Sequence, residues 1–251
     1  SNYRRSVKMT GSSEPNNAVR PAIRTPRFAL AIAMAWTRRL LGGDRFENLY
    51  GAVRSTLENI EPQPKSLLDY GCGSMDFSRR LREEGVINKF VAMDTYAAPD
   101  NLEGVECWKD YRQIHDGILS DLRESFDVAI IIDVLHHADE SEQPTILAAL
   151  GNTAGRVVVK DHFEFGYVSR QMLRLADWFG NFAYGVRIPK RYFDKQSWPL
   201  IVRSSGLVEV ARVENVKVHS GLFGVLLPRH HHFISILASG AAPSAQAPKN
   251  P

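Results

Sequence analysis

The sequence is poor in cysteine and has no long apolar run, and each shortage excludes a class of protein. Only Cys72 and Cys107 are present among 251 residues, in no CxxC or cysteine–histidine spacing that would bind zinc. A disulfide scaffold is therefore excluded, and both thiols are expected to be buried in a protein of the reducing cytoplasm. The apolar run Phe28–Trp36 is much shorter than the ~20 residues that a membrane-spanning helix needs.

That early apolar run has small residues at alternate positions, as a signal-peptide cleavage site does. It begins late, however, and continues through Arg38 and Arg39 to Leu41. We therefore expect a helix that packs on the domain or lies at a membrane surface, and packing is the favoured alternative.

Negative charge is scarce at the start of the chain. Up to Arg45, nine Lys or Arg residues stand against only Glu14 and Asp44, an excess of +7, although the whole chain carries only +3. We expect residues 1–27 to form a flexible basic arm, either solvated or in peripheral contact with an anionic membrane. No motif predicts specific recognition of nucleic acid.

After the arm, residues 28–62 are expected to form N-terminal helices. In the second helix, apolar residues recur every three or four positions and share one face. From Ser66 onward, short apolar strands alternate with helices, which is typical of a parallel sheet covered on both faces. The expected strands are Ser66–Tyr70, Lys89–Asp94, Val105–Lys109, Phe126–Asp133, Arg156–Lys160, Leu207–Val218 and His232–Ala238.

The last two expected strands are close enough in the chain to form an antiparallel pair. The fold class is therefore α/β: a three-layer sandwich with a seven-stranded, mostly parallel sheet, a late antiparallel strand pair and N-terminal helices. We assign residues 63–238 to this domain and residues 239–251, rich in Ala, Pro and Ser, to a disordered tail.

A glycine turn follows the first strand. Gly71 and Gly73, between a strand and a helix, let the backbone approach a ligand closely. Asp94 ends the second strand, 23 residues after Gly71, where a carboxylate can accept hydrogen bonds from both hydroxyls of a ribose. Together these features predict a site for an adenosine-type ligand. Asp76 stands where a dinucleotide-binding turn needs Gly or Ala, and its charge would repel a pyrophosphate, so S-adenosylmethionine is favoured over a nicotinamide dinucleotide.

Three segments resemble, in order and spacing, the motifs of class I (Rossmann-like) S-adenosylmethionine-dependent methyltransferases. Leu67–Gly73 is similar to their first motif, Val91–Asp94 to their second strand, and Phe126–His137 to the fourth-strand motif of their small-molecule branch. The cofactor-binding residues that this resemblance implies are Asp69, Gly71, Cys72, Gly73, Asp94, Asp110, Asp133 and Val134.

Within this set, the resemblance implies that the two glycines line the methionine portion of the cofactor. Asp94 would hold the ribose, Asp110 would lie near the adenine, and Asp133 and Val134 would form the floor of the pocket. Many members carry a third glycine where this chain has Met75, which leaves the start of the following helix less open.

Methyl transfer is an in-line displacement at an activated carbon, so the protein must align the nucleophile, exclude water and, where needed, accept a proton. Ligands of open α/β sheets bind outside the carboxyl ends of the strands. The catalytic candidates are therefore His136 and His137 after the fourth strand, and Asp161 and His162 after the fifth. His162 is the first choice for a general base, because the pKa of His lies near neutrality. Alternatively, these side chains shape the pocket or bond to nearby backbone.

Residues 163–206, between the fifth and sixth strands, combine aromatic side chains with glycine hinges and are expected to cover the acceptor. The alternative is simple helix packing, because Val168, Met172, Leu175 and Phe179 share one stripe of a predicted helix. The expected acceptor-binding residues are Trp178, Asn181, Tyr184 and Tyr192.

The sequence thus predicts methyl transfer from S-adenosylmethionine to a small-molecule or lipid-like acceptor at O, N or C. One alternative is a cofactor-binding module that acts in a complex without catalysis. A dinucleotide-dependent oxidoreductase is disfavoured by Asp76. No metal is expected, and His230-His231-His232 would converge poorly on an ion, since successive strand residues point to opposite faces.

Overall fold

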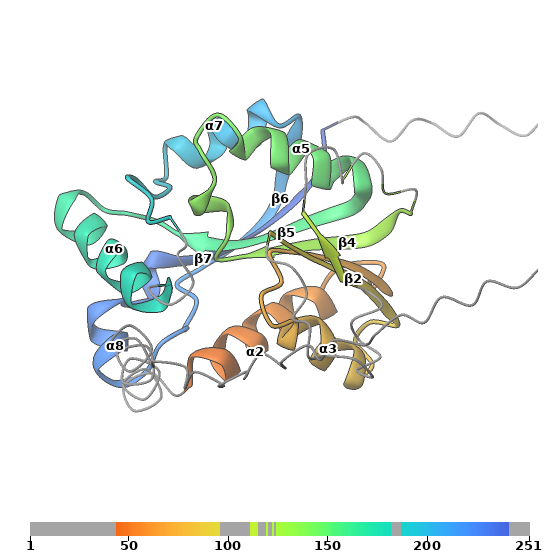
Figure 1. Ribbon diagram of the computed structural model, residues 1–251, viewed down its shortest axis with the longest axis horizontal. Helices are drawn as coiled ribbons and strands as arrows, with labels where there is room; N and C mark the ends of the chain where they lie inside the picture. The colour runs from red at the N-terminus through yellow and green to blue at the C-terminus, as the bar shows by residue number, and fades with distance from the viewer. Residues whose placement is uncertain are drawn as a thin grey trace, which may run out of the picture.

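The computed structural model describes residues 44–95, 111–114, 119, 122, 124–181 and 187–240. A sheet covered by helices on both faces organises this part of the chain (Figure 1). Its strands are β1 (Ser66–Tyr70), β2 (Lys89–Asp94), β3 (Tyr111–Gln113), β4 (Phe126–Ile132), β5 (Ala154–His162), β6 (Leu207–Glu214) and β7 (His232–Ser239). The helices are α2 (Arg45–Glu58), α3 (Asp76–Glu83), α5 (Gln143–Thr153), α6 (Tyr167–Asn181), α7 (Ser197–Ser204) and α8 (Gly221–Leu226), with short 3-10 helices η2 (Leu135–His137) and η3 (Arg229–His231).

The strands lie in the order β3-β2-β1-β4-β5-β7-β6. The neighbours among β3, β2, β1, β4 and β5 pair in parallel, whereas β7 is antiparallel to both β5 and β6. The predicted α/β sheet, mostly parallel with a late antiparallel pair, is thus confirmed. The carboxyl ends of the parallel strands share one edge of the sheet, which is where open α/β sheets bind ligands.

The sheet separates two apolar cores. Ala129 and Ile131 of β4 pack in the core beneath α5 and α7, whereas Val128 and Ile130 pack on the opposite face with α2 and α3. Figure 1 shows these two helix pairs above and below the sheet. All four strand residues are fully buried, because a strand covered on both faces must be apolar along its whole length.

The amphipathic pattern predicted for the second N-terminal helix is confirmed by α2. Leu49, Tyr50, Val53 and Leu57 are buried on its sheet-facing side. The arm, the apolar run Phe28–Trp36 and most of the expected tail lie outside the described residues. No helix in the described ranges is long and apolar enough to span a membrane.

Two strands end earlier than predicted because the next residues adopt left-handed backbone. β4 ends at Ile132 rather than at Asp133, whose φ is 54°. β6 ends at Glu214, before Asn215 at φ 59°, rather than at Val218. Such φ values lie outside the extended region and interrupt a strand.

α5 continues through Gly151 to Thr153. A methyl group at Gly151 would lie 2.5 Å from Leu207 Cδ2, so this glycine allows close packing of α5 on the start of β6. The predicted third strand, Val105–Lys109, lies outside the described residues, and β3 follows it at Tyr111–Gln113.

Candidate active site

The glycine turn is held directly against the end of β2. The backbone N–H groups of Gly71 and Cys72 both donate to the carbonyl of Met93, at 2.7 and 3.0 Å. Gly71 has φ 77°, and a methyl group added there would lie 2.4 Å from Val134 Cγ2. Only glycine meets both conditions, so glycine at this position allows the turn to lie directly against Val134.

Gly73 and Asp94 face each other across the carboxyl edge of the sheet. The Gly73 N–H donates to Asp94 Oδ2 at 2.8 Å, and Thr95 Oγ1 donates to the other carboxylate oxygen at 3.3 Å. Gly73 has φ 53°, and no atom lies within 4 Å of the position that its side chain would take. A turn with open space beside it and a carboxylate opposite fit an adenosine-type cofactor.

Asp69, predicted to bind the cofactor, lies in the core rather than at the edge. It is only 3% exposed, and Ser78 of α3 donates a hydrogen bond to it at 2.5 Å. Burial raises the pKa of Asp69 to about 7, against the lowering effect of the Ser78 hydrogen bond. This contact fastens the start of α3 to β1 behind the turn, which makes Asp69 a support for the turn.

Met75 fills the position where a third glycine was expected from the resemblance. Its φ is 60°, a left-handed conformation that side chains rarely adopt, and its side chain is fully buried in the core shared with α2. The backbone at this point therefore keeps the glycine-like geometry, and apolar burial compensates for the strain. Cys72 is partly buried beside it, and burial raises the pKa of its thiol.

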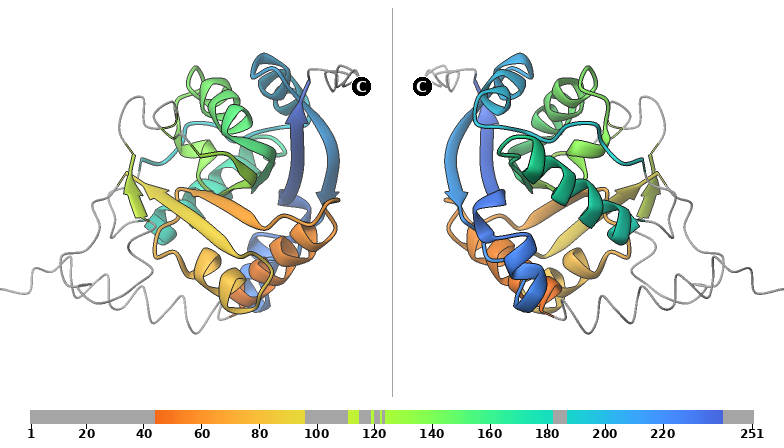
Figure 2. Two further views of the ribbon diagram at one scale, coloured as in Figure 1. Left: turned by 90° about the vertical axis from the view of Figure 1, so that its right-hand side faces the viewer. Right: turned by 90° about the vertical axis from the view of Figure 1, so that its left-hand side faces the viewer.

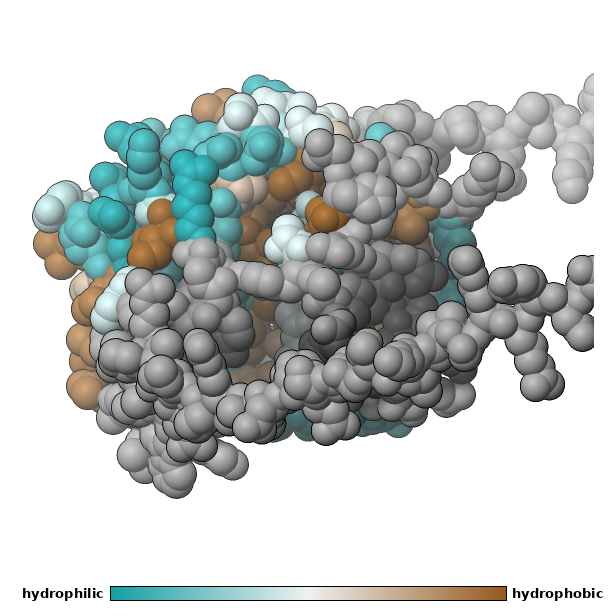
Figure 3. Space-filling model, in the orientation of Figure 1, coloured by the Kyte–Doolittle hydropathy of each residue, from teal (hydrophilic) through white to brown (hydrophobic). Residues whose placement is uncertain are grey.

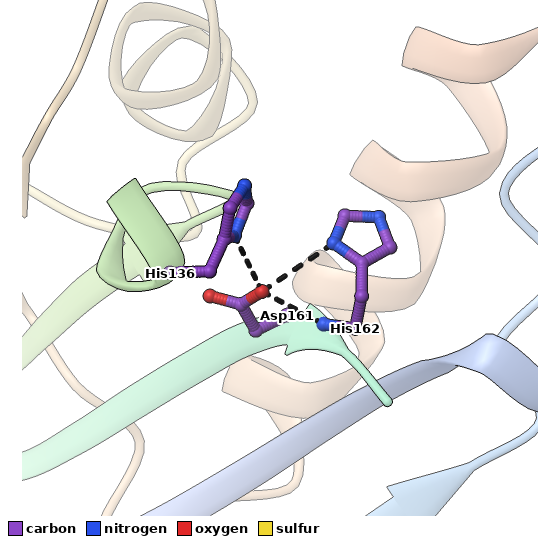
Figure 4. A group of neighbouring side chains, drawn as sticks. All are labelled: His136, Asp161 and His162. Atoms are coloured by element: carbon purple, nitrogen blue, oxygen red, sulfur yellow. Dashed lines mark hydrogen bonds and ion pairs between the residues drawn. The ribbon is translucent and has the colours of Figure 1, made fainter. Parts of the chain in front are cut away.

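A histidine–aspartate cluster lies at the end of β5 (Figure 4). Asp161 Oδ1 accepts a hydrogen bond from the backbone N–H of His162 at 2.8 Å. It also lies 2.6 Å from His136 Nδ1 and 3.4 Å from His162 Nδ1. All three side chains are buried, so the predicted catalytic residues His136, Asp161 and His162 come together in one polar cluster.

His136 stands between two carboxylates. Its Nε2 atom is 3.3 Å from Oδ2 of Asp177 on α6, and the Tyr192 hydroxyl donates to the same Asp177 oxygen. Burial disfavours a charged ring, but Asp161 and Asp177 together raise the pKa of His136 to about 10. The ring is therefore an imidazolium at neutral pH, a donor to Asp161 and an ion-pair partner of Asp177, and not a base.

A second charged group adjoins this cluster, since His162 Nδ1 also lies 3.5 Å from Asp133 Oδ1. The ammonium of Lys160, which is fully buried, donates to Asp133 Oδ1, and Arg45 of α2 pairs with Asp133 Oδ2 at 2.7 Å. Burial opposes ionisation of Asp133, but the charges of Lys160 and Arg45 hold its pKa well below the usual value. Burial lowers the pKa of Lys160, partly offset by Asp133. The carboxylate of Asp133, predicted to floor the cofactor pocket, is thus engaged by two cations.

A family model described as a methyltransferase domain matches residues 43–211. The chain belongs to this methyltransferase family. The matched range begins just before α2 and ends within β6, so it contains the glycine turn, Asp94 and the histidine–aspartate cluster. The prediction of an S-adenosylmethionine-dependent methyltransferase is thereby confirmed. No curated protein matches the chain.

Solved structures show the same fold. One is the Burkholderia thailandensis 1,6-didemethyltoxoflavin-N1-methyltransferase, 15% identical, with a TM-score of 0.53 over 85% of this chain and 89% of that chain. Another is in the complex between the Haloferax volcanii Trm112 methyltransferase activator and a putative methyltransferase, 12% identical, with a TM-score of 0.56 over 88% and 99%. The pyocyanin biosynthetic protein PhzM is 16% identical, with a TM-score of 0.54 over 86% and 59%. At these identities the likeness establishes the fold alone.

The predicted acceptor-binding residues of the methyltransferase are only partly described. The ring of Tyr192, buried, lies 5.4 Å from that of His136, and Trp178 is 39% exposed on α6. Tyr184 and the side chain of Asn181 lie outside the described part, as does the predicted adenine contact Asp110.

The remaining predicted catalytic residue, His137, lies at the surface side of η2. Its Nδ1 atom is 2.8 Å from the carbonyl oxygen of Arg187, and burial lowers the pKa of the ring. A hollow of about 410 Å³ opens over His136 and His137. Its other lining residues are Ala138, Asp139, Glu140, Ser141, Gln143, Arg187, Pro189, Lys190 and Arg191.

Two sets of ionisable side chains in the described ranges have polar atoms within 4.8 Å of one another: His136 with Asp161 and His162, and His136 with His137 and Asp177. Neither set contains a member of the His230–His232 run. His231 Nδ1 lies 2.8 Å from the Phe163 carbonyl oxygen, and His232 Nδ1 lies 3.4 Å from Lys160 Nζ, so these rings serve different contacts. The expectation that the protein holds no metal stays a prediction.

Sequence reasoning missed Lys160, Asp177 and Arg45 as site residues. Lys160 gave a usable signal, because a lysine inside an apolar strand must find a buried partner. Arg45 gave none, since it is 88 residues from Asp133 in the chain.

Proposed function

We propose that this methyltransferase transfers the methyl group of S-adenosylmethionine to a small-molecule acceptor bound above the ends of β4 and β5. The observation that carries the proposal is the bond between Gly73 and Asp94, beside the histidine–aspartate cluster at the same sheet edge. One similar structure, the 1,6-didemethyltoxoflavin-N1-methyltransferase, was solved with its small-molecule ligand and S-adenosylhomocysteine. That enzyme supports a small acceptor for this fold.

The residues that would hold the cofactor are Gly71 and Gly73 at its methionine portion, Asp94 at its ribose and Val134 at the floor. When bound, the cofactor supplies a methyl group that is already activated for displacement. The protein's share is then to orient the acceptor, exclude water and accept a proton where the acceptor carries one.

His162 fits the role of general base better than His136 does. The imidazolium of His136 already carries its proton and pairs with Asp161 and Asp177, so it cannot accept another. His162 presents Nδ1 to Asp161, and its other ring nitrogen points away from that carboxylate (Figure 4). Asp161 would fix the tautomer of His162 and leave that second nitrogen as the proton acceptor.

Calorimetric titration with S-adenosylhomocysteine and with NADH tests the cofactor assignment. We expect micromolar binding of the first and none of the second, and the reverse result would overturn the proposal. Incubation with S-adenosylmethionine and a panel of phenols, amines and heteroaromatic compounds then tests catalysis. Binding without turnover of any acceptor would favour the alternative of a non-catalytic module.

Peripheral contact with an anionic membrane through residues 1–27 stays a prediction, because the arm lies outside the described residues. Sedimentation with phosphatidylserine vesicles tests it. The full chain would sediment with the vesicles, and a chain lacking residues 1–27 would not.

A further inference from the structure

An exposed apolar surface spans α6 and α8. We call it the α6–α8 face. It consists of Tyr167 (72% exposed), Val168 (71%) and Leu175 (56%) on α6, and Leu222 (56%), Val225 (74%) and Leu226 (44%) on α8. Figure 3 shows brown, apolar residues along the left edge of the molecule, where Figure 1 places these two helices. In the right view of Figure 2 both helices face the viewer.

This face argues against the alternative of simple helix packing for the stripe of α6. In that alternative the stripe containing Val168 and Leu175 would be buried, yet the buried side of the helix carries Ser169 and Leu173 instead. Leu173 packs against Leu227, the residue that follows α8, so the two helices adjoin and their exposed sides form one surface. An exposed apolar surface shared by two helices marks a contact site for another part of the chain or for a partner.

The start of α2 lies close to this face. The Asn48 side-chain amide donates to the Val218 carbonyl at 3.3 Å and to Ser220 Oγ at 3.5 Å. Ser220 is the residue directly before α8, and the Arg45–Asp133 ion pair fixes the first turn of α2. The described chain therefore begins, at Asp44, beside α8.

The segment 28–41 is apolar except for Thr37, Arg38 and Arg39. In a helix, Phe28, Ile32, Trp36 and Leu40 would lie along one side and Leu30 and Met34 along the other, with alanines between them. Its 14 residues would make a helix of about 21 Å, close to the length of the 15-residue α6. Only two residues separate Leu41 from Asp44, so the segment is tethered close to the α6–α8 face.

We propose that segment 28–41 docks as a helix on the α6–α8 face of its own chain. A tether of two residues gives the segment an effective concentration that a dilute partner does not match, which favours it over a second copy or a membrane. Because α6 carries Asp177, the docked segment would also steady the carboxylate that contacts His136. The inference goes beyond methyl transfer and is independent of the acceptor.

Limited trypsin digestion of the full chain tests the docking, because Arg38 and Arg39 are cleavage sites inside the segment. We compare the wild-type chain with Val225→Asp on α8 and Leu175→Asp on α6. Val210→Asp is the matched control, since Val210 is 53% exposed on β6. Melting temperatures establish that every variant folds.

We expect slow cleavage at Arg38 and Arg39 in the wild-type and control chains, and cleavage at least tenfold faster in both test variants. Equal cleavage rates in all four chains would overturn the proposal. Slow cleavage that depends on protein concentration, with a dimer in sedimentation, would assign the face to a second copy instead. Slow cleavage only in the presence of phosphatidylserine vesicles would assign it to a membrane.

Discussion

The backbone N–H of Gly73 donates a hydrogen bond to the carboxylate of Asp94, 2.8 Å away, across the carboxyl edge of the sheet. Because the two groups belong to the turn after β1 and to the end of β2, this bond fixes the distance between the parts of the site that would hold opposite ends of the cofactor. Replacing Asp94 by Ala should weaken binding of S-adenosylhomocysteine by about 1–3 kcal/mol, the value of hydrogen bonds to a charged group.

Isothermal titration of the Asp94→Ala chain checks this prediction. The loss corresponds to a roughly 5- to 150-fold higher Kd. Glu61→Ala, which removes an exposed carboxylate before β1, is the control and should bind as the wild type does. Unchanged affinity in Asp94→Ala would show that the ribose assignment is wrong.

The two glycines of the turn should differ in their response to alanine. Gly73→Ala incurs only the strain of a left-handed φ, about 1–2 kcal/mol, because open space surrounds the site. Gly71→Ala adds a clash with Val134 and should lose about 2–5 kcal/mol of stability in total. Urea unfolding measures both losses. Adding Val134→Ala to the Gly71→Ala chain should relieve the clash but not the backbone strain. Equal losses for the two glycines would contradict the close approach of Val134.

Replacing Lys160 alone should destabilise the protein more than replacing Lys160 and Asp133 together. Lys160→Met leaves the carboxylate of Asp133 buried without its main partner, which costs about 3–5 kcal/mol. Asp133→Asn keeps a residue that tolerates φ 54°, so the double variant should be more stable than Lys160→Met. A double-mutant cycle from urea unfolding gives the coupling. Additive losses would show that the pair does not interact.

Stability should depend on His136 in alkaline solution. The pKa of His136 is raised from 6.5 to about 10 in the folded chain, so the folded state binds the proton more tightly than the unfolded state does. The stabilisation is complete below the unfolded pKa near 6.5 and is lost as pH rises through about 10. The difference in unfolding free energy between wild type and His136→Asn should therefore shrink from pH 7 to pH 10.

His230→Asn is the control for that series, because His230 is an exposed histidine near the same end of the sheet. Its stability should run parallel to that of the wild type across the range. A wild-type advantage over His136→Asn that stays constant with pH would mean that the ring is not charged between its two carboxylates.

Once an acceptor with an ionisable O–H or N–H is found, His162→Gln should lower kcat by about 10²–10⁴-fold, the usual contribution of a general base. The affinity for S-adenosylhomocysteine should stay within twofold, since His162 acts on the acceptor. The pH–rate profile of the variant should lose the limb that reports the base. A full rate with an unchanged profile would leave His162 as a structural residue.

Local pattern was enough to predict much of this molecule. Gly71, Gly73 and Asp94 lie at strand ends that the sequence marks by apolar runs, and the topology of parallel strands then brings them together. The charged pair of Lys160 with Asp133 and the contact of Asp177 with His136 depend on which segments meet in space, and no periodicity encodes that. The stripe of Val168 and Leu175 has helical spacing, but spacing alone does not show whether such a stripe packs against the sheet or lies at the surface.

The direction of β7 has a consequence for how the enzyme could be changed. Every other strand delivers its last residue to the ligand edge, whereas β7 delivers its first, since His232 pairs with His162. The whole connection between Glu214 and His232 therefore starts and returns at that edge without crossing the sheet. Exchanging α8 alone within this connection would change the surface near the ligand edge and would leave in place Val216 and Val218, which pack in the core with β1 and β4.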